Sequence, residues 1–242
     1  MNRPILTFLF FVLTVFAGCT PSGENIARRA DLDAEGKQVT APGSAMETAT
    51  VLEPATGRFL QSYGPAIKRY AERYGFDWRL VLAVMKQESR FSRHAESSRG
   101  ATGLMQIMPV TSEELARTLD LEDLSHPVNN IQAGVFYLKK LYDLFDGASE
   151  ADRIKLTLAA YNAGISRVYD AQEMAAYLHE SPLQWQAVRD ALPFLSKRFY
   201  TLHRSIWGQD KPKSGYFGNA RQTINYVDAI MNYYDDYRSV LN

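Results

Sequence analysis

Apolar side chains recur every three or four residues along most of the chain after Arg58, and this spacing is the strongest constraint on the fold. It is the spacing of the buried face of an amphipathic helix. No run alternates apolar and polar residues as a half-buried strand does. We therefore predict a mostly α domain over residues 58–242. The clearest stripes are Phe59, Tyr63, Ile67, Tyr70 and Tyr74; Ile131, Val135, Leu138, Tyr142 and Phe145; and Ile224, Val227, Met231, Tyr234 and Tyr237.

Polar residues and a proline indicate where some of these helices begin or end. Asp77 precedes the apolar run from Leu80 to Met85 and can cap the helix that carries it. The stretch from Thr111 to Glu114 has the pattern of a capping box and predicts a second helix start. Pro193 falls inside a stripe that runs from Trp185 to Leu202, so we expect a break or a kink there.

The first 57 residues differ from the rest in composition. Arg3 is followed by an apolar run that ends at Gly18 and is short for a membrane span, which is typical of a signal peptide over residues 1–18. The single cysteine, Cys19, comes next, and its position resembles the lipobox of bacterial lipoproteins, whose cysteine is acylated. The alternative is an ordinary secretory signal. Residues 19–57 are then expected to comprise the lipidated cysteine and a flexible tether rich in Pro, Ser, Gly and Thr.

Charge and residue spacing argue against several classes of function. Lys plus Arg and Asp plus Glu both number 27, so the formal net charge is zero and nothing favours a nucleic-acid partner. The four histidines are not spaced as metal ligands, and there is no glycine-rich phosphate loop or dinucleotide fingerprint. We expect neither a metal site nor a cofactor.

Glu88 is the most informative charged residue, because it follows an apolar helix and precedes a Ser-, Arg- and Gly-rich loop. A carboxyl group partly inside an apolar wall loses hydration, which raises its pKa and keeps it protonated near neutral pH. That state suits a general acid that donates a proton to a glycosidic oxygen. The plainer alternative is a surface ion pair with Arg90 or Arg93.

Three blocks of sequence occur in order around and after this glutamate. ESRF begins at Glu88 and is followed by Ser97 and by GATGLMQIMP, which begins at Gly100. NIQAG and AYNAG follow, beginning at Asn130 and Ala160. Together the blocks resemble the lysozyme-like lytic transglycosylases of bacterial cell walls, the SLT domain family. The chain from about residue 191 onward is also similar to the catalytic module of the membrane-bound F-type enzymes. The resemblance implies a helical fold of the goose-type lysozyme class with a substrate groove.

The resemblance also implies an activity. Glu88 would act first as acid and then as base in cleaving the β-1,4 bond between N-acetylmuramic acid and N-acetylglucosamine, with a 1,6-anhydromuramoyl product. One carboxyl group suffices for this reaction, whereas hydrolytic glycosidases usually need two. Glu96, Asp120 and Asp123 are the nearest other candidates, and none lies in a family motif.

Substrate-binding residues carry over by position from the family motifs. Ser97 would contact the muramoyl acetamido or peptide-bearing side, Gln106 the sugar, and Met108 the groove wall. Tyr161 would hold its hydroxyl against Glu88, and Asn162 would contact sugar. Plainer roles stay open for three of them: a loop hydroxyl for Ser97, a tie to the backbone for Gln106, and a core ring for Tyr161.

Two other functions share the same partner, the peptidoglycan glycan strand. A hydrolytic muramidase would use water and a second carboxylate and would release reducing sugars. A non-catalytic scaffold would keep the groove alone. In every case acylation of Cys19 would anchor the protein to a membrane. Thr20, rather than aspartate, after the cysteine resembles the enterobacterial signal for the outer membrane, so we expect a periplasmic protein on its inner face.

Overall fold

The computed structural model describes residues 52–242. The expected signal peptide over residues 1–18, the acylated Cys19 and most of the tether lie outside the described residues. The described part is helical, and its β-type pairing is limited to two isolated bridges, Glu96 with Thr102 and Thr102 with Ile107. The prediction of a mostly α domain is confirmed.

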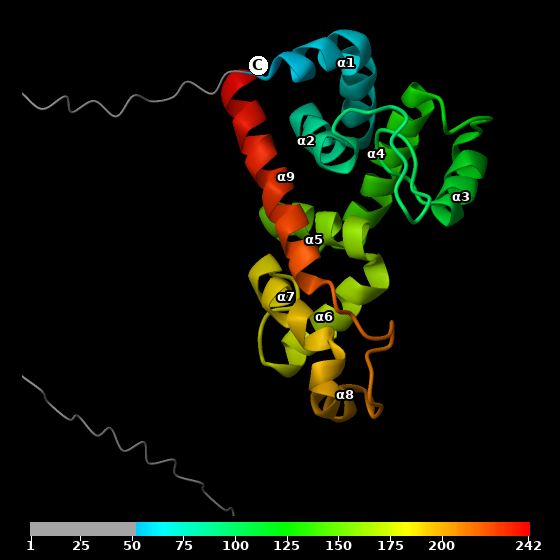
Figure 1. Cartoon of the computed structure of the whole chain (residues 1–242). Coiled ribbons are helices and arrows are strands. Elements are labelled where there is room, and N and C mark those ends of the chain that lie inside the picture. The colour runs from blue at the N-terminus through cyan, green and yellow to red at the C-terminus, as the bar shows by residue number, and fades with distance from the viewer. Residues whose placement is uncertain (1–51) are drawn as a thin grey trace, which may run out of the picture. The chain divides into compact units, whose positions relative to one another are not determined.

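Nine α-helices and two short 3-10 helices make up the described part of the chain (Figure 1). They are α1 (Pro54–Tyr74), α2 (Trp78–Ser89), α3 (Pro109–Leu119), α4 (Pro127–Asp143), α5 (Glu150–Ala163), α6 (Ile165–Tyr177), α7 (Trp185–Ala191), η1 (Leu192–Leu195), η2 (Lys197–Phe199), α8 (Tyr200–Trp207) and α9 (Ala220–Val240).

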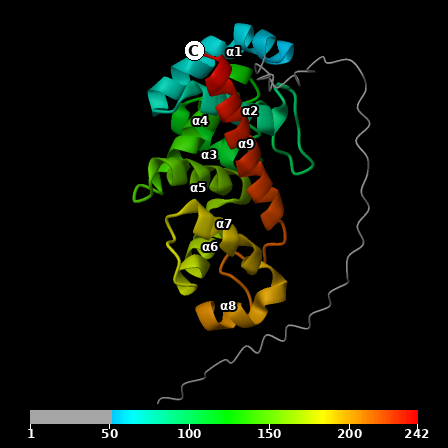
Figure 2. The same cartoon turned by 90° about the vertical axis from the view of Figure 1, so that its left-hand side faces the viewer.

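The last helix, α9, connects the two ends of this domain. It packs against α2, then against α5, and its first residues reach η1 (Figures 1 and 2). Its end is fixed at the start of α2, where Tyr234 donates a hydrogen bond to Asp77 (3.0 Å) and Arg79 donates one to the carbonyl oxygen of Leu241 (3.0 Å). The two helices therefore run side by side in opposite directions, with the end of α9 at the start of α2.

Two of the predicted helix starts have different outcomes. Asp77 caps α2 as predicted, since its side chain accepts a hydrogen bond from the backbone N–H of Arg79 (2.9 Å). The capping box at Thr111 is wrong, because α3 already begins at Pro109 with Met108 as its N-cap. Proline suits the first helical position, where its missing N–H has no helical partner to lose.

Other boundaries follow from proline and glycine as well. Helix α1 begins at Pro54, four residues before the expected start at Arg58. Pro193 breaks the stripe after Trp185 as predicted, and the chain passes from α7 into η1 there. The apolar stripes in the sequence do not predict α6, whose first helical residue follows Gly164 directly.

The loop between α2 and α3 is held from beneath by Asn130 on α4. Its side-chain oxygen accepts the backbone N–H of Met105 (2.8 Å), and its nitrogen donates to the carbonyl oxygens of Thr102 (3.3 Å) and Leu124 (3.2 Å). Gly103 has a φ of +78°, and a Cβ atom there would lie 2.5 Å from the Asn130 side chain. Only glycine allows this approach.

The same loop is pressed against α4 at a second point. A Cβ atom on Gly134 would lie 2.5 Å from Cβ and Cγ of Met105, which is fully buried. The glycines of the GATG and NIQAG blocks thus serve backbone packing between loop and helix.

No helix within residues 52–242 combines the length and the apolar character needed to cross a membrane.

Replacing Gly134 with alanine should destabilise the domain, because the added methyl group meets the stem of Met105 rather than a movable side-chain end. We expect Gly134→Ala to lower the free energy of unfolding by about 1–3 kcal/mol, measured by urea denaturation. The matched control is Gly57→Ala in α1, where nothing lies within 4 Å of the new atom. That control should be neutral or stabilising, and equal losses in both variants would contradict the packing argument.

Candidate active site

Glu88 lies in the last turn of α2, the helix whose residues Leu80 to Met85 are all buried. Apolar packing on that helix brings the carboxyl group into a site from which water is largely removed. Burial raises the pKa of Glu88 from its ordinary 4.5 to about 7. Loss of hydration disfavours the charged carboxylate, so the proton is held more tightly. At neutral pH the group is poised between its acid and base forms.

Tyr226 on α9 supplies the partner of this carboxyl group. Its hydroxyl donates a 2.5 Å hydrogen bond to Oε1 of Glu88, across 138 positions of sequence. The bond stabilises the carboxylate and so lowers the Glu88 pKa, against the larger effect of burial. Burial, and then the negative charge of Glu88, hold the pKa of Tyr226 well above its usual range, so its hydroxyl keeps its proton and acts as a donor.

Tyr161 was expected to hold its hydroxyl against Glu88, and that expectation is wrong in detail. Its hydroxyl donates instead to the carbonyl oxygen of Met105 (2.7 Å) in the loop before α3. Tyr161 still lies close to the carboxyl group, because burial and then the charge of Glu88 raise the Tyr161 pKa well above its usual range. The hydroxyl of Tyr226 on α9 bonds Glu88 instead, and the carbonyl oxygen of Met105 accepts the hydrogen bond of Tyr161.

Asn162 follows Tyr161 at the end of α5 and is tied to α9. Its side-chain oxygen accepts a hydrogen bond from the hydroxyl of Thr223 (2.9 Å). Thr223 lies three residues before Tyr226, so one face of α9 holds both Asn162 and Glu88. The asparagine side chain remains exposed. Its amide nitrogen, the donor end, is available to a ligand.

Gln106 and Ser97 both stabilise the loop that contains them. The Gln106 amide nitrogen donates to the carbonyl oxygens of Ala95 (2.9 Å) and Gly103 (3.0 Å), with a backbone φ of +47°. The Ser97 hydroxyl accepts the backbone N–H of Ala101 (3.0 Å). Ser97 thus serves as a loop hydroxyl and Gln106 as a tie to the backbone, the plainer of the roles predicted for each. The amide oxygen of Gln106 is left as an acceptor.

Two adjoining hollows lie beside these residues. The Gln106 hollow has a volume of about 270 Å³ and includes Gln106, Met108, Tyr161 and Asn162 in its wall. The Thr223 hollow, of about 240 Å³, includes Asn162 and Thr223. Arg99, Asn162 and Ala163 belong to both walls, so the two hollows adjoin. Met108 is 38% exposed, as a wall residue would be. Four of the predicted site residues thus meet in one hollow, whereas neither Glu88 nor Ser97 lines it.

A second carboxylate does not act on Glu88 within residues 52–242. Its pKa is set by burial and by Tyr226. Glu96, Asp120 and Asp123 are all exposed, and Asp123 is engaged by Ser125. The described part of the chain also contains no group of three His, Cys, Asp or Glu residues able to hold a metal ion.

Comparison with known proteins identifies the family of this domain. Residues 65–182 match the family described as the transglycosylase SLT domain. This domain belongs to the SLT family. Glu88, Ser97, Gln106, Met108, Tyr161 and Asn162 all lie in the matched segment, whereas Thr223 and Tyr226 lie beyond it.

Relatives of the SLT domain bear a consistent name. Membrane-bound lytic murein transglycosylase F from Desulfosudis oleivorans is 37% identical over 179 residues, which are 73% of this chain and 36% of the relative. The protein of that name from Shewanella pealeana is 32% identical, over 73% of this chain and 34% of the relative. The chain therefore spans about a third of the length of these curated relatives.

Two solved structures resemble the SLT domain and its C-terminal helices. The 70-kDa soluble lytic transglycosylase from Escherichia coli superposes with a TM-score of 0.52 and 25% identity, over 76% of this chain and 25% of that chain. An inactive glutamate-to-glutamine variant of the lytic transglycosylase Slt from Pseudomonas aeruginosa gives 0.52 and 26% over the same shares. The predicted lysozyme-like helical fold is confirmed by these neighbours.

Removing the Tyr226 hydroxyl should raise the Glu88 pKa further. The hydrogen bond favours the carboxylate, so its loss leaves burial unopposed. We expect Tyr226→Phe to move the Glu88 titration above the wild-type value of about 7, measured by NMR of ¹³C-labelled glutamate side chains. Tyr234→Phe is the matched control, because that hydroxyl bonds Asp77 at the far end of α9. A lower or unchanged value in Tyr226→Phe would refute the assignment.

Proposed function

We propose that this protein is a peptidoglycan lytic transglycosylase. It cleaves the β-1,4 bond between N-acetylmuramic acid and N-acetylglucosamine and leaves a 1,6-anhydromuramoyl end. The observation that carries the proposal is a desolvated carboxyl group, Glu88, whose pKa of about 7 lets it give up and take back a proton at neutral pH. The names of the relatives and of the solved neighbours support the same class of activity.

In the first step Glu88 acts as a general acid. Its proton goes to the O4 atom of the leaving N-acetylglucosamine as the bond from O4 to C1 of the muramoyl residue breaks. The acetamido group of that residue stabilises the positive charge that develops on C1. An acid with a pKa near the working pH suits this transfer, and the rate of this step falls as pH rises through about 7 and Glu88 loses its proton.

In the second step the same group acts as a general base. The Glu88 carboxylate takes the proton of the C6 hydroxyl, and O6 forms a bond to C1. One C–O bond is broken and one is formed, the proton on Glu88 is restored, and no water is consumed. Tyr226 stabilises the carboxylate between the two steps by donating its hydrogen bond to Oε1.

The remaining site residues hold the strand in place. Asn162 offers its amide nitrogen and Gln106 its amide oxygen to sugar hydroxyl or acetamido groups, while Met108 supplies apolar wall. Tyr161 fixes the loop at Met105 and so positions this wall. Ser97 acts through the shape of the loop, since its hydroxyl is already engaged by Ala101, or contacts the strand at the loop's edge.

Hydrolysis is disfavoured by the surroundings of Glu88. A water nucleophile would need a second carboxylate to activate it, and none acts on Glu88 in the described residues. A purely structural role is disfavoured as well, because a non-catalytic scaffold gains nothing from the desolvation of a carboxyl group. Proteins keep such costly groups mainly at functional sites.

The decisive experiment is mass spectrometry of the material released from purified sacculi. We expect 1,6-anhydromuramoyl products from the wild type and at least about a hundredfold less from Glu88→Gln, since the amide cannot donate the proton. Glu96→Gln is the matched control and should release the wild-type amount. Reducing sugars from the wild type would move the protein to the hydrolases, and unchanged release by Glu88→Gln would remove Glu88 from its role.

We also propose that Cys19 is acylated and anchors the protein to a membrane on the periplasmic side, at the inner face of the outer membrane. The position of Cys19 after an apolar run, and the words "membrane-bound" in the relatives' names, support this. Two or more acyl chains give stable anchoring, at about 0.8 kcal/mol for each buried CH₂ group.

Replacing the cysteine tests the anchor directly. In cells that express Cys19→Ser, we expect the protein to leave the membrane fraction and to lack the mass of attached acyl chains. Thr20→Ser serves as the control and should stay with the membrane. A Cys19→Ser protein that remains membrane-bound would show that another segment anchors the chain.

A further inference from the structure

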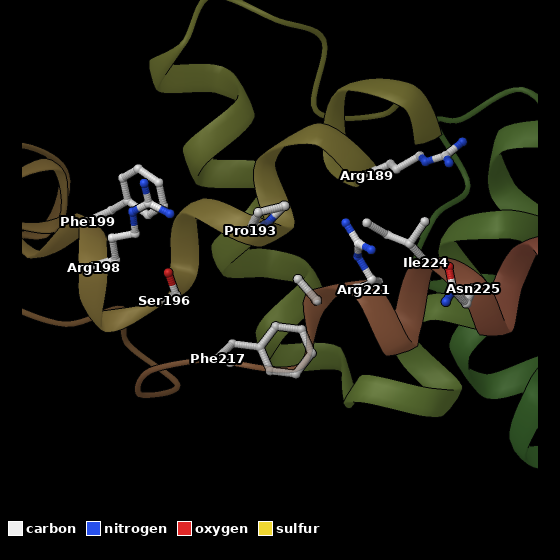
Figure 3. A pocket seen from close by; sticks show the side chains of 11 residues that line it. Arg189, Pro193, Ser196, Arg198, Phe199, Phe217, Arg221, Ile224 and Asn225 are labelled. Carbon is white, nitrogen blue, oxygen red and sulfur yellow. The ribbon is translucent and has the colours of Figure 1, made fainter.

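A third and larger hollow lies next to the candidate active site, between the α7–η1–η2 segment and the start of α9 (Figure 3). We call it the arginine hollow; its volume is about 590 Å³. Its wall includes three arginines, two polar side chains and a buried ring: Arg189, Arg198, Arg221, Ser196, Asn225 and Phe217. Figure 3 shows Arg221 extending from α9 toward the segment that carries Pro193.

The positive charge of this hollow is only partly neutralised. Arg189 contacts Asp228 at its edge (3.2 Å). Arg198 and Arg221 form no ion pair with any residue of 52–242, and the Arg198 guanidinium lies over the Phe199 ring (5.6 Å). No aspartate or glutamate lines the wall. In a chain with zero formal net charge, this is a local concentration of positive charge.

The arginine hollow adjoins the Thr223 hollow of the candidate active site. Phe217 and Gly218 line both it and the Thr223 hollow. The Thr223 hollow adds Arg99 and Arg167 and again contains no acidic residue in its wall. Arginine side chains therefore line both of these adjoining hollows, and the Thr223 hollow also includes Asn162.

The arginine hollow is also separate from the segment that defines the family. Its lining runs from Arg189 to Asn225, whereas the SLT match covers residues 65–182. The hollow is thus built by the C-terminal helices, which bring Tyr226 to Glu88 as well. The C-terminal helices therefore supply both the hydrogen-bond partner of Glu88 and the wall of the arginine hollow.

We propose that the arginine hollow binds the carboxylates of the peptide stems that branch from the glycan strand. This inference rests on the proposed function. Planar guanidinium groups bind carboxylates with two parallel hydrogen bonds, and Arg198 and Arg221 are available for this. Phe217 and Ile224 give apolar surface for the small side chains of a stem. A bound strand then enters with its sugars in the Gln106 hollow and a stem in the arginine hollow.

The test measures equilibrium binding of fluorescently labelled glycan strands, with stems intact or removed by an amidase. Binding is measured in the Glu88→Gln background so that the strands are not cut. The variant is Arg198→Gln with Arg221→Gln. Its control, Arg58→Gln with Arg69→Gln, removes the same charge from exposed positions of α1 outside all three hollows. Stem-bearing strands carry more negative charge than stem-free strands, so any loss of positive charge could weaken their binding. The α1 control measures that general effect.

We expect the parent protein to bind stem-bearing strands about tenfold or more tightly than stem-free strands, as one charged hydrogen-bonded contact provides. The Arg198 and Arg221 variant should lose most of that ratio, and the α1 control should keep it. A parent ratio near one, or equal loss in variant and control, would overturn the inference. Failure of the proposed function is a separate result, since it is the absence of anhydro products from the wild type.

Discussion

The hydrogen bond from Tyr226 to Glu88 is the contact on which the rest of the site depends. A carboxyl group at the end of an apolar helix is costly to ionise, and burial alone would raise its pKa further. The hydroxyl on α9 offsets part of that cost, so the pKa stays at about 7. Both protonation states are then within reach at neutral pH. A one-carboxyl mechanism needs this balance, because the same group donates and later accepts the proton.

The loop between α2 and α3 is also held in place by several contacts. Asn130 pairs with two backbone groups of this loop, Gly103 and Gly134 allow close contact between loop and α4, and the Tyr161 hydroxyl bonds the carbonyl oxygen of Met105. Because buried polar groups must be paired, these contacts leave the loop little freedom to rearrange. Many residues of the family blocks therefore hold the loop that forms one wall of the Gln106 hollow. Fewer of them face that hollow than the sequence alone indicates.

The C-terminal helices extend this core in two ways. Through α9 they supply Tyr226 and Thr223, and through α7, η1 and η2 they form one side of a cavity with unneutralised arginines. Charge that cancels over the whole chain is thereby separated in space. This explains why a net charge of zero, which gives no support to a nucleic-acid partner, says little about a local anion site.

The sequence by itself determined the helical class, the cap at Asp77, the break at Pro193 and the position of Glu88 at the end of an apolar helix. These follow from local periodicity and backbone chemistry. The tertiary structure decided which tyrosine holds Glu88. The stripe chosen on α9 included Ile224 and Met231, yet the buried face contains Thr223, Tyr226 and Ile230. A helix turns by about 100° per residue, so stripes one residue apart are both plausible until packing selects one. Contacts 138 positions apart depend on that choice, and local sequence does not encode it.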